Sequence, residues 1–247
     1  MSARRLVLFL LLTAAIAAAQ SAKPKKKKWP KWKSGVREGT VLIDGKQEAF
    51  TALVPRGFTQ KKAWPAVLLA HGNGGAAANF LRGVKSMAGK KPPLLISLER
   101  CDNKQEAVGY APKYLEQLKE VFHLDENNVY ALGFSGGGFR LWDDIVCNAE
   151  ALTRFAGVVL VGCGKQSYNP PEKPAKAPAI LFVGDPKDSN YGRSSPAAAD
   201  GLKQLGYEVL LFEHSSGHTL PRKEMKAVFE WIRKRIKENK KKARKKG

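Results

Sequence analysis

Residues 129–147 read VYALGFSGGGFRLWDDIVC and join an apolar strand to a helix through a serine flanked by glycines. The segment 129–133 has the continuous apolar character of a buried strand, and 136–147 has helical spacing. A serine at such a tight turn points its hydroxyl away from the sheet, and flanking glycines are needed because a Cβ would contact the neighbouring strand and helix. The stretch therefore predicts a sharp turn at Ser135, with the first N–H groups of the helix beside the hydroxyl.

The same alternation of apolar strands and helical patterns continues on both sides of this turn. Further strands bounded by glycine or proline are predicted at 66–70, 94–98, 156–162, 179–184 and 208–213. A hairpin around Asp44 and Gly45 is predicted from 40–43 and 49–54, and helices from 105–123, 196–205 and 221–236. Strands that are apolar throughout are buried on both faces, so we expect a three-layer α/β domain with a mostly parallel sheet of about eight strands and no large cap.

The Ser135 hydroxyl needs partners, because an unperturbed hydroxyl is a weak nucleophile and requires a base that a carboxylate orients. Loops that follow the carboxyl ends of parallel strands lie at the same edge of the sheet as this serine. His218 lies in the loop after the last strand and is the expected base, with His214 as the alternative. Asp188 is the expected orienting acid and Asp185 the alternative. Two further carboxylates, at 143 and 144, are expected on the solvated face of the helix after the serine.

The segment HGNGG at residues 71–75 follows another apolar strand. Its glycine-rich backbone can direct N–H groups at a developing oxyanion. We expect the N–H of Gly136 and one N–H of this loop, from either Asn73 or Gly74, to form an oxyanion hole. Because the loop acts through its backbone, we expect a structural role for the His71 side chain.

The chain order Ser135, Asp188, His218, together with HG after a strand, resembles the α/β-hydrolase superfamily. The motifs GFSGGG and HGNGG are most similar to secreted esterases of the polyhydroxybutyrate-depolymerase, feruloyl-esterase and phospholipase/carboxylesterase types. The resemblance implies cleavage of a small-molecule or polymeric ester through an acyl-enzyme, without metal or organic cofactor. In these families the acid usually follows the strand-end glycine by three residues, whereas Asp185 and Asp188 follow Gly184 by one and by four.

Two other functions remain open on the sequence. The first is a serine peptidase or acyltransferase of the same fold. The second is a non-catalytic binder of anionic polymers through the basic ends of the chain. The complete set of serine, histidine and aspartate favours an enzyme over a binder, and we expect it to be a monomer.

Most of the net charge of +21 lies at the two ends of the 247-residue chain. Residues 1–19 have two arginines, an apolar run and closing small residues, which predicts a signal peptide and a secreted or periplasmic protein. A basic Lys/Pro/Trp linker is predicted at 20–35, the hydrolase-like domain at 36–236 and a disordered basic tail at 237–247. The tails are therefore expected to tether the protein to an anionic polymer or membrane surface, whereas Trp29 and Trp32 are expected to pack on the domain.

The three cysteines, Cys101, Cys147 and Cys163, lack the close spacing of a structural zinc site. Cys101 and Cys163 both follow predicted strand ends at one edge of the sheet. They are therefore the pair expected to form a disulfide if one forms.

Overall fold

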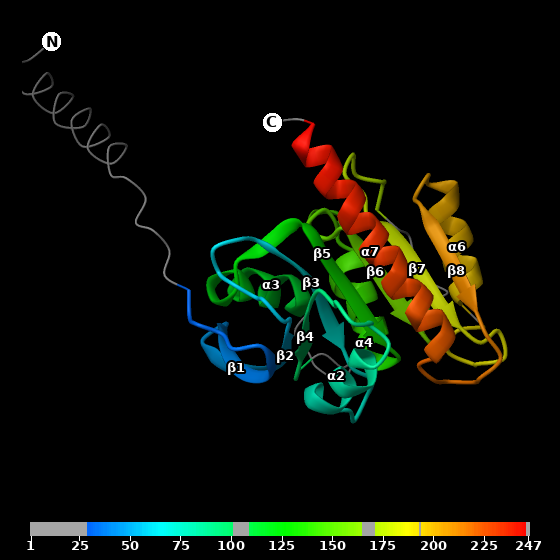
Figure 1. The fold of residues 1–247 in the computed structure, drawn as a ribbon. Helices are drawn as coiled ribbons and strands as arrows, with labels where there is room; N and C mark the ends of the chain where they lie inside the picture. Colours follow the sequence, from blue (N-terminus) through cyan, green and yellow to red (C-terminus); the bar gives the residue numbers. More distant parts are fainter. Residues whose placement is uncertain (1–28, 101–108, 165–170, 193, 246–247) are drawn as a thin grey trace, which may run out of the picture.

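The computed structural model describes residues 29–100, 109–164, 171–192 and 194–245. Eight strands form one sheet in the order β1-β2-β4-β3-β5-β6-β7-β8 (Figure 1). Only the pairs β1–β2 and β2–β4 are antiparallel. The strands are β1 (Gly35–Ile43), β2 (Lys46–Val54), β3 (Trp64–Ala70), β4 (Leu94–Leu98), β5 (Leu124–Phe134), β6 (Gly157–Val161), β7 (Ala179–Gly184) and β8 (Val209–Glu213).

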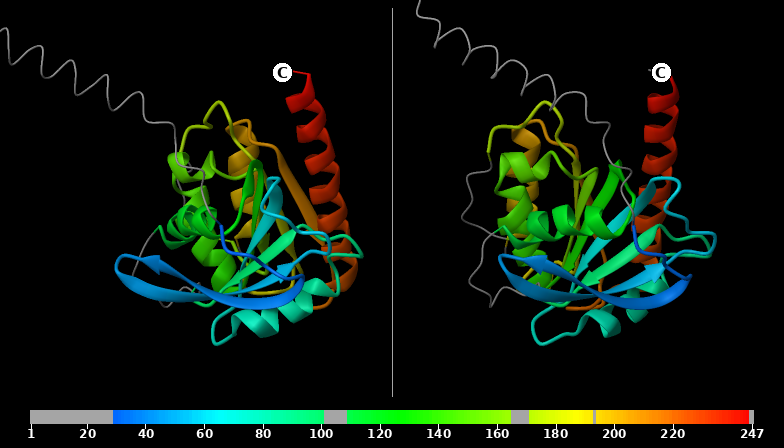
Figure 2. Two further views of the ribbon diagram at one scale, coloured as in Figure 1. Left: turned by 60° about the vertical axis from the view of Figure 1, so that its left-hand side comes forward. Right: turned by 90° about the vertical axis from the view of Figure 1, so that its left-hand side faces the viewer.

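Helices cover both faces of this sheet (Figure 2). They are α2 (Ala77–Lys85), α3 (Tyr110–Val121), α4 (Gly136–Leu141), α5 (Ala149–Leu152), α6 (Ser195–Gln204) and α7 (Arg222–Arg244), with a π-helix η1 (Trp142–Val146). One core lies between the sheet and α3, η1 and α6, and contains Leu118, Trp142 and Leu202. The other lies between the sheet and α2 and α7, and contains Leu81 and Val228. The arrangement confirms the predicted three-layer α/β domain.

The hairpin of β1 and β2 turns at the predicted residues. Asp44 and Gly45 have φ angles of 49° and 78°. Two successive positive φ angles are what a two-residue hairpin turn with the right twist requires. Both strands are longer than predicted, because β1 already begins at Gly35, opposite Val54, and β2 begins at Lys46, opposite Ile43.

The helix after Ser135 differs from its prediction in two ways. It is α-helical only as far as Leu141 and then widens into η1. The expectation of a solvated Asp144 is wrong, since this residue is 1% exposed. Its carboxylate accepts hydrogen bonds from the N–H groups of Gly109 (2.7 Å) and Ala111 (3.0 Å) and pairs with Arg140 at 2.9 Å. Helical spacing predicts which face of its own helix a carboxylate lies on. It does not predict that the first N–H groups of α3 need a hydrogen-bond acceptor at this face.

The last helix is longer than predicted. It runs to Arg244, so residues 237–244, which we expected in a disordered tail, are helical. This stretch contains neither glycine nor proline, and Asn239 donates to the carbonyl of Asn127 at 3.0 Å. The free energy gained by continuing the helix therefore exceeds the cost of repulsion among the lysines.

Trp29 and Trp32 pack on the domain, as predicted. The ring of Trp29 stacks on His123 with centroids 4.5 Å apart, and its Nε1 donates to the Lys119 carbonyl at 3.1 Å. Trp32 stacks on Phe122 at 5.0 Å. The predicted signal peptide and the linker up to residue 28 lie outside the described residues. None of the helices in the described ranges is long and apolar enough to cross a bilayer.

Cys163 contradicts the predicted disulfide, because it is a free thiol in the core. Its Sγ lies against Gly138 of α4, in the space that a Cβ there would occupy. Burial raises the pKa of this thiol. Cys147 is exposed, and Cys101 lies outside the described residues.

Candidate active site

Ser135 lies in the sharp turn between β5 and α4 with φ 51° and ψ −120°. A residue with a Cβ rarely adopts a positive φ, and such strain persists only where the surroundings hold it in place. Its N–H donates to the Val161 carbonyl at 2.8 Å, and its carbonyl accepts from the N–H of Phe139 at 3.0 Å. The turn is therefore tied to the neighbouring strand β6 and to the first turn of α4.

The glycines around Ser135 allow this close approach of strand and helix. A Cβ on Gly133 would lie 2.6 Å from the carbonyl oxygen of Gly137, and one on Gly137 would overlap the carbonyl oxygens of Ala70 and His71. The sequence predicted that glycine is required here. The cause is that a side chain would collide with backbone carbonyl groups of the neighbouring strand and helix.

Gly137→Ala is expected to lower the free energy of unfolding by about 3 kcal/mol, because neither carbonyl can move aside as a flexible side chain would. Gly201→Ala is the matched control: a Cβ there meets nothing within 4 Å, so the substitution should leave stability unchanged or raise it by about 0.5–1 kcal/mol. Urea denaturation of both variants measures the difference. Equal midpoints for the two variants would contradict this account of the turn.

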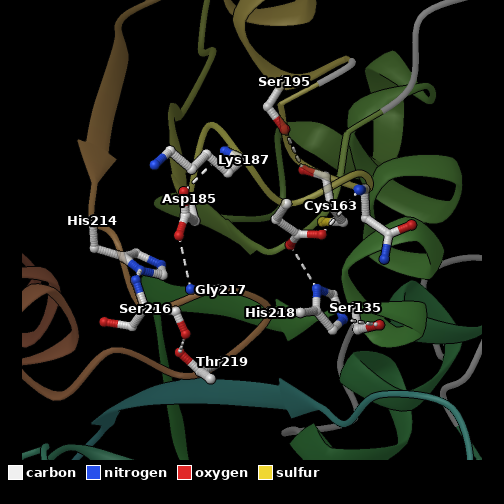
Figure 3. A network of polar contacts seen from close by, with 12 residues as sticks. Ser135, Cys163, Asp185, Lys187, Ser195, His214, Ser216, Gly217, His218 and Thr219 are labelled. Carbon is white, nitrogen blue, oxygen red and sulfur yellow. Dashed lines mark hydrogen bonds and ion pairs between the residues drawn. The ribbon is translucent and has the colours of Figure 1, made fainter.

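The structure brings together the three side chains predicted for the site. Ser135 Oγ lies 2.8 Å from Nε2 of His218, and Nδ1 of His218 lies 2.6 Å from Oδ2 of Asp188 (Figure 3). A proton on Nδ1 lets the imidazole donate to the carboxylate, so that Nε2 accepts from the serine hydroxyl. The Asp188 side chain is 4% exposed and the His218 side chain 35%. The acid is thus buried behind the histidine, while the serine side of the ring is open to a substrate.

Packing holds the imidazole of His218 in this position. Its ring centroid lies 5.0 Å from that of Phe134. On Gly162, a Cβ would come within 3.1 Å of the ring. Neither residue could be assigned to the site from the sequence, because neither carries a group that takes part in proton transfer.

Asp185 has a different role from Asp188. Its carboxylate accepts from the N–H groups of Lys187 (2.9 Å) and Gly217 (2.8 Å). These two backbone donors hold the pKa of Asp185 below its usual value. Because Gly217 directly precedes His218, the alternative acid anchors the histidine loop, and its carboxylate is engaged with backbone donors.

The alternative base, His214, is engaged within its own loop. Its N–H donates to the Gly184 carbonyl at 3.1 Å, and its Nδ1 accepts from the N–H of Ser216 at 3.1 Å. Figure 3 shows its ring on the far side of Gly217 from His218. Of the two candidate histidines, only His218 reaches the serine.

The loop 71–75 lies beside the turn, as expected. The backbone nitrogen of Asn73 lies 3.0 Å from the position of a Cβ on Gly136, which places this nitrogen against the start of α4. Gly74 has φ 71° at the apex of the loop, and a Cβ there would meet nothing within 4 Å. Of the two alternatives, Asn73 is therefore the residue adjacent to Gly136. The side-chain oxygen of Asn73 also points at Gly136, a contact that the sequence did not predict.

His71 is buried at the base of this loop. Its Nδ1 lies 2.8 Å from the Gly72 carbonyl and its Nε2 2.9 Å from the Glu99 carbonyl. It is 3% exposed, in keeping with the structural role expected for it.

A cavity of about 350 Å³ opens next to the loop 71–75. Residues 71–76 form one wall, and Asn79, Phe80, Phe134 and Leu220 form the rest. Among the residues that the structure describes, no lysine, arginine or carboxylate lines it. Among the described residues, no group of three or more His, Cys, Asp or Glu side chains could hold a metal ion.

No protein-family model matches the sequence, and no curated protein matches it significantly. Solved structures do match. A thermostable esterase is 18% identical over 81% of this chain and 60% of its own, with a TM-score of 0.57. A ferulic acid esterase is 12% identical over 83% of this chain and 100% of its own, with a TM-score of 0.62. Dipeptidyl peptidase 4 of Porphyromonas gingivalis is 9% identical over 82% of this chain but 35% of its own, with a TM-score of 0.59.

This chain thus spans 60% of the length of the thermostable esterase and about a third of the peptidase. At these identities the likeness concerns the fold, which esterases and a peptidase share. The reaction therefore depends on the side chains of the site.

Proposed function

We propose that this chain, which has the α/β-hydrolase fold, is a serine hydrolase that cleaves carboxylic esters, with Ser135 as nucleophile, His218 as base and Asp188 as orienting acid. The observation that carries the proposal is the continuous hydrogen-bonded path from Ser135 Oγ through the imidazole to a buried carboxylate. This path begins at a strained residue between a strand and a helix, the geometry that exposes a nucleophile to substrate.

In the proposed reaction, His218 Nε2 takes the proton of Ser135 as Oγ attacks the ester carbonyl carbon. The N–H groups of Gly136 and Asn73 stabilise the negative oxygen of the tetrahedral intermediate. Protonated His218 then gives the proton to the leaving alcohol, which departs and leaves an acyl-enzyme. Water, deprotonated by the same histidine, attacks the acyl carbon; collapse of the second intermediate releases the acid and restores Ser135.

Two observations support an ester over a peptide as substrate. The ferulic acid esterase is covered over 100% of its length, whereas the peptidase has about two thirds of its chain outside the matched region. The cavity of about 350 Å³ beside the loop 71–75 lies at the small end of ligand pockets, and no charged side chain of the described residues lines it. We propose that it accepts a short acyl chain or a single aromatic ring.

A fluorophosphonate probe and a panel of esters test the proposed function. We expect covalent labelling at Ser135, located by peptide mass spectrometry, since the probe requires an activated hydroxyl. Among p-nitrophenyl esters, acetate and butyrate should be hydrolysed faster than palmitate, because the cavity is too small for a long chain. Absence of labelling, or cleavage of a peptide p-nitroanilide with every ester left intact, would contradict the proposal.

A further inference from the structure

A second cavity lies at the amino ends of the parallel strands, whereas Ser135 lies at their carboxyl ends. It is a groove of about 970 Å³ at the start of β3 and β4. The strand β3 runs from Trp64 at the groove to Ala70 beside the serine turn, roughly 20 Å at 3.3 Å per residue. Figure 1 shows the C-terminal half of α7 at this end of the molecule, away from α4. A ligand in the groove would leave the candidate active site free.

The floor of the groove is apolar. Trp64, Pro65, Pro93 and Ile236 contribute to it. The Trp64 ring already has two neighbours. The Lys62 ammonium lies 4.4 Å from the ring centroid, and the Phe58 ring centroid lies 5.3 Å from it.

The rim of the groove is positive. The loops before β3 and β4 contribute Arg56, Lys62, Lys90 and Lys91, all of which are exposed. None of these four forms an ion pair within the part of the chain that the structure describes. Among the described residues, these four side chains therefore have no carboxylate within ion-pair distance.

Helix α7 adds Arg233, Lys237 and Lys240 to the same groove. Of these, Arg233 is the one that lies within ion-pair distance of a carboxylate in the described part of the chain, that of Glu230 at 4.0 Å. No aspartate or glutamate of the described ranges lines the groove. The C-terminal basic segment, which the sequence presents as a separate tail, is thus folded against the basic loops of the domain and makes one positive surface with them.

We propose that this groove binds a linear acidic polysaccharide. Seven cations around one concave surface attract a polymer that carries a row of negative charges. The concave shape suits a single extended chain better than the flat surface of a bilayer. Single-stranded nucleic acid binds on aromatic rings with free faces. Trp64 is the one aromatic residue among the described residues that line the groove, and the Lys62 ammonium already lies over one face of its ring. The proline and isoleucine floor can instead pack against the apolar faces of sugar rings.

The test compares two triple variants of the full chain. Arg56→Glu/Lys90→Glu/Lys237→Glu reverses charge in the groove, and Lys46→Glu/Lys223→Glu/Lys226→Glu makes the same change in net charge at exposed positions outside it. Isothermal titration calorimetry at physiological ionic strength measures the affinity for polygalacturonate. We expect the groove variant to bind about ten-fold more weakly than wild type or worse, and the control to lose less than about three-fold.

Further probes complete the experiment. We expect neutral dextran not to bind, and oligo(dT) and phosphatidylglycerol vesicles to bind more weakly than polygalacturonate. Equal losses in the two triple variants would overturn the proposal, because binding would then follow net charge alone. Groove-dependent binding that is tighter for oligo(dT) or for the vesicles would overturn it in favour of a nucleic acid or a membrane. None of these readouts depends on Ser135 or on ester hydrolysis.

Discussion

Ser135→Ala is expected to reduce kcat/KM for p-nitrophenyl butyrate by about 10³-fold or more, because the variant has no oxygen for His218 to activate. The effect should appear in kcat, since the substitution removes the nucleophile and leaves the cavity and the oxyanion donors in place. Hydrolysis under saturating substrate, with the enzyme concentration corrected for folded protein, measures it.

The control for this variant is Ser34→Ala, at an exposed residue before β1. It should retain the activity of wild type. Circular dichroism of Ser135→Ala should match wild type, because alanine carries the same Cβ through the same turn. Ester hydrolysis that is equal in wild type and Ser135→Ala would refute the serine mechanism, and any residual rate would have to come from another group.

The strands and the order of the site residues could be predicted from the sequence, because each depends on local patterns. An apolar run between glycine and proline predicts a buried strand wherever it pairs. A loop after a parallel strand lies at one edge of the sheet whatever its length. Ser135 and His218 were therefore predictable from their places after β5 and β8, although 83 residues separate them.

Other features depended on contacts between distant segments. The burial of Asp144 follows from a helix, α3, whose first N–H groups happen to face it. The choice between Asn73 and Gly74 turned on how closely the loop approaches Gly136. The disulfide prediction failed because two strand ends at one edge do not determine where the Cys163 thiol points. In each case the sequence restricted the residue to a region, and packing decided its contact.

The position of the basic C-terminal residues also could not be predicted from the sequence. The count of charged residues along the chain assigned most of the positive charge to tails outside the domain. The structure continues α7 to Arg244 and brings Lys237 and Lys240 into the same groove as Lys90. Part of the charge that the sequence assigns to a flexible segment therefore belongs to a folded surface, and that is the physical basis for proposing a specific polyanion site.

Asp188→Asn is expected to lower kcat by about 10³–10⁴-fold. The carboxylate of Asp188 accepts from Nδ1 of His218, which leaves Nε2 free to take the serine proton. An amide at this position can donate to Nδ1, so the imidazole proton moves to Nε2 and the base function is lost. The substrate cavity is unchanged, so KM should stay close to that of wild type.

The matched comparison is Asp185→Asn, which makes the same chemical change three residues earlier. Its carboxylate accepts from Lys187 and Gly217 and does not reach the imidazole, so we expect a loss in kcat of about ten-fold or less from a looser histidine loop. The two variants are compared by steady-state kinetics on one ester. A greater loss for Asp185→Asn than for Asp188→Asn would assign the orienting role to Asp185 and contradict the geometry.

A second readout separates anchoring from catalysis at Asp185. The backbone donors of Lys187 and Gly217 lower the pKa of this carboxyl in the folded protein. A group with a lowered folded-state pKa stabilises the fold above its unfolded pKa, and the contribution is lost as the pH falls through the folded value. The thermal midpoint of Asp185→Asn should therefore lie below that of wild type at neutral pH, and the difference should shrink in acid. A difference that stays constant over this range would mean that the charge of Asp185 does not hold the loop.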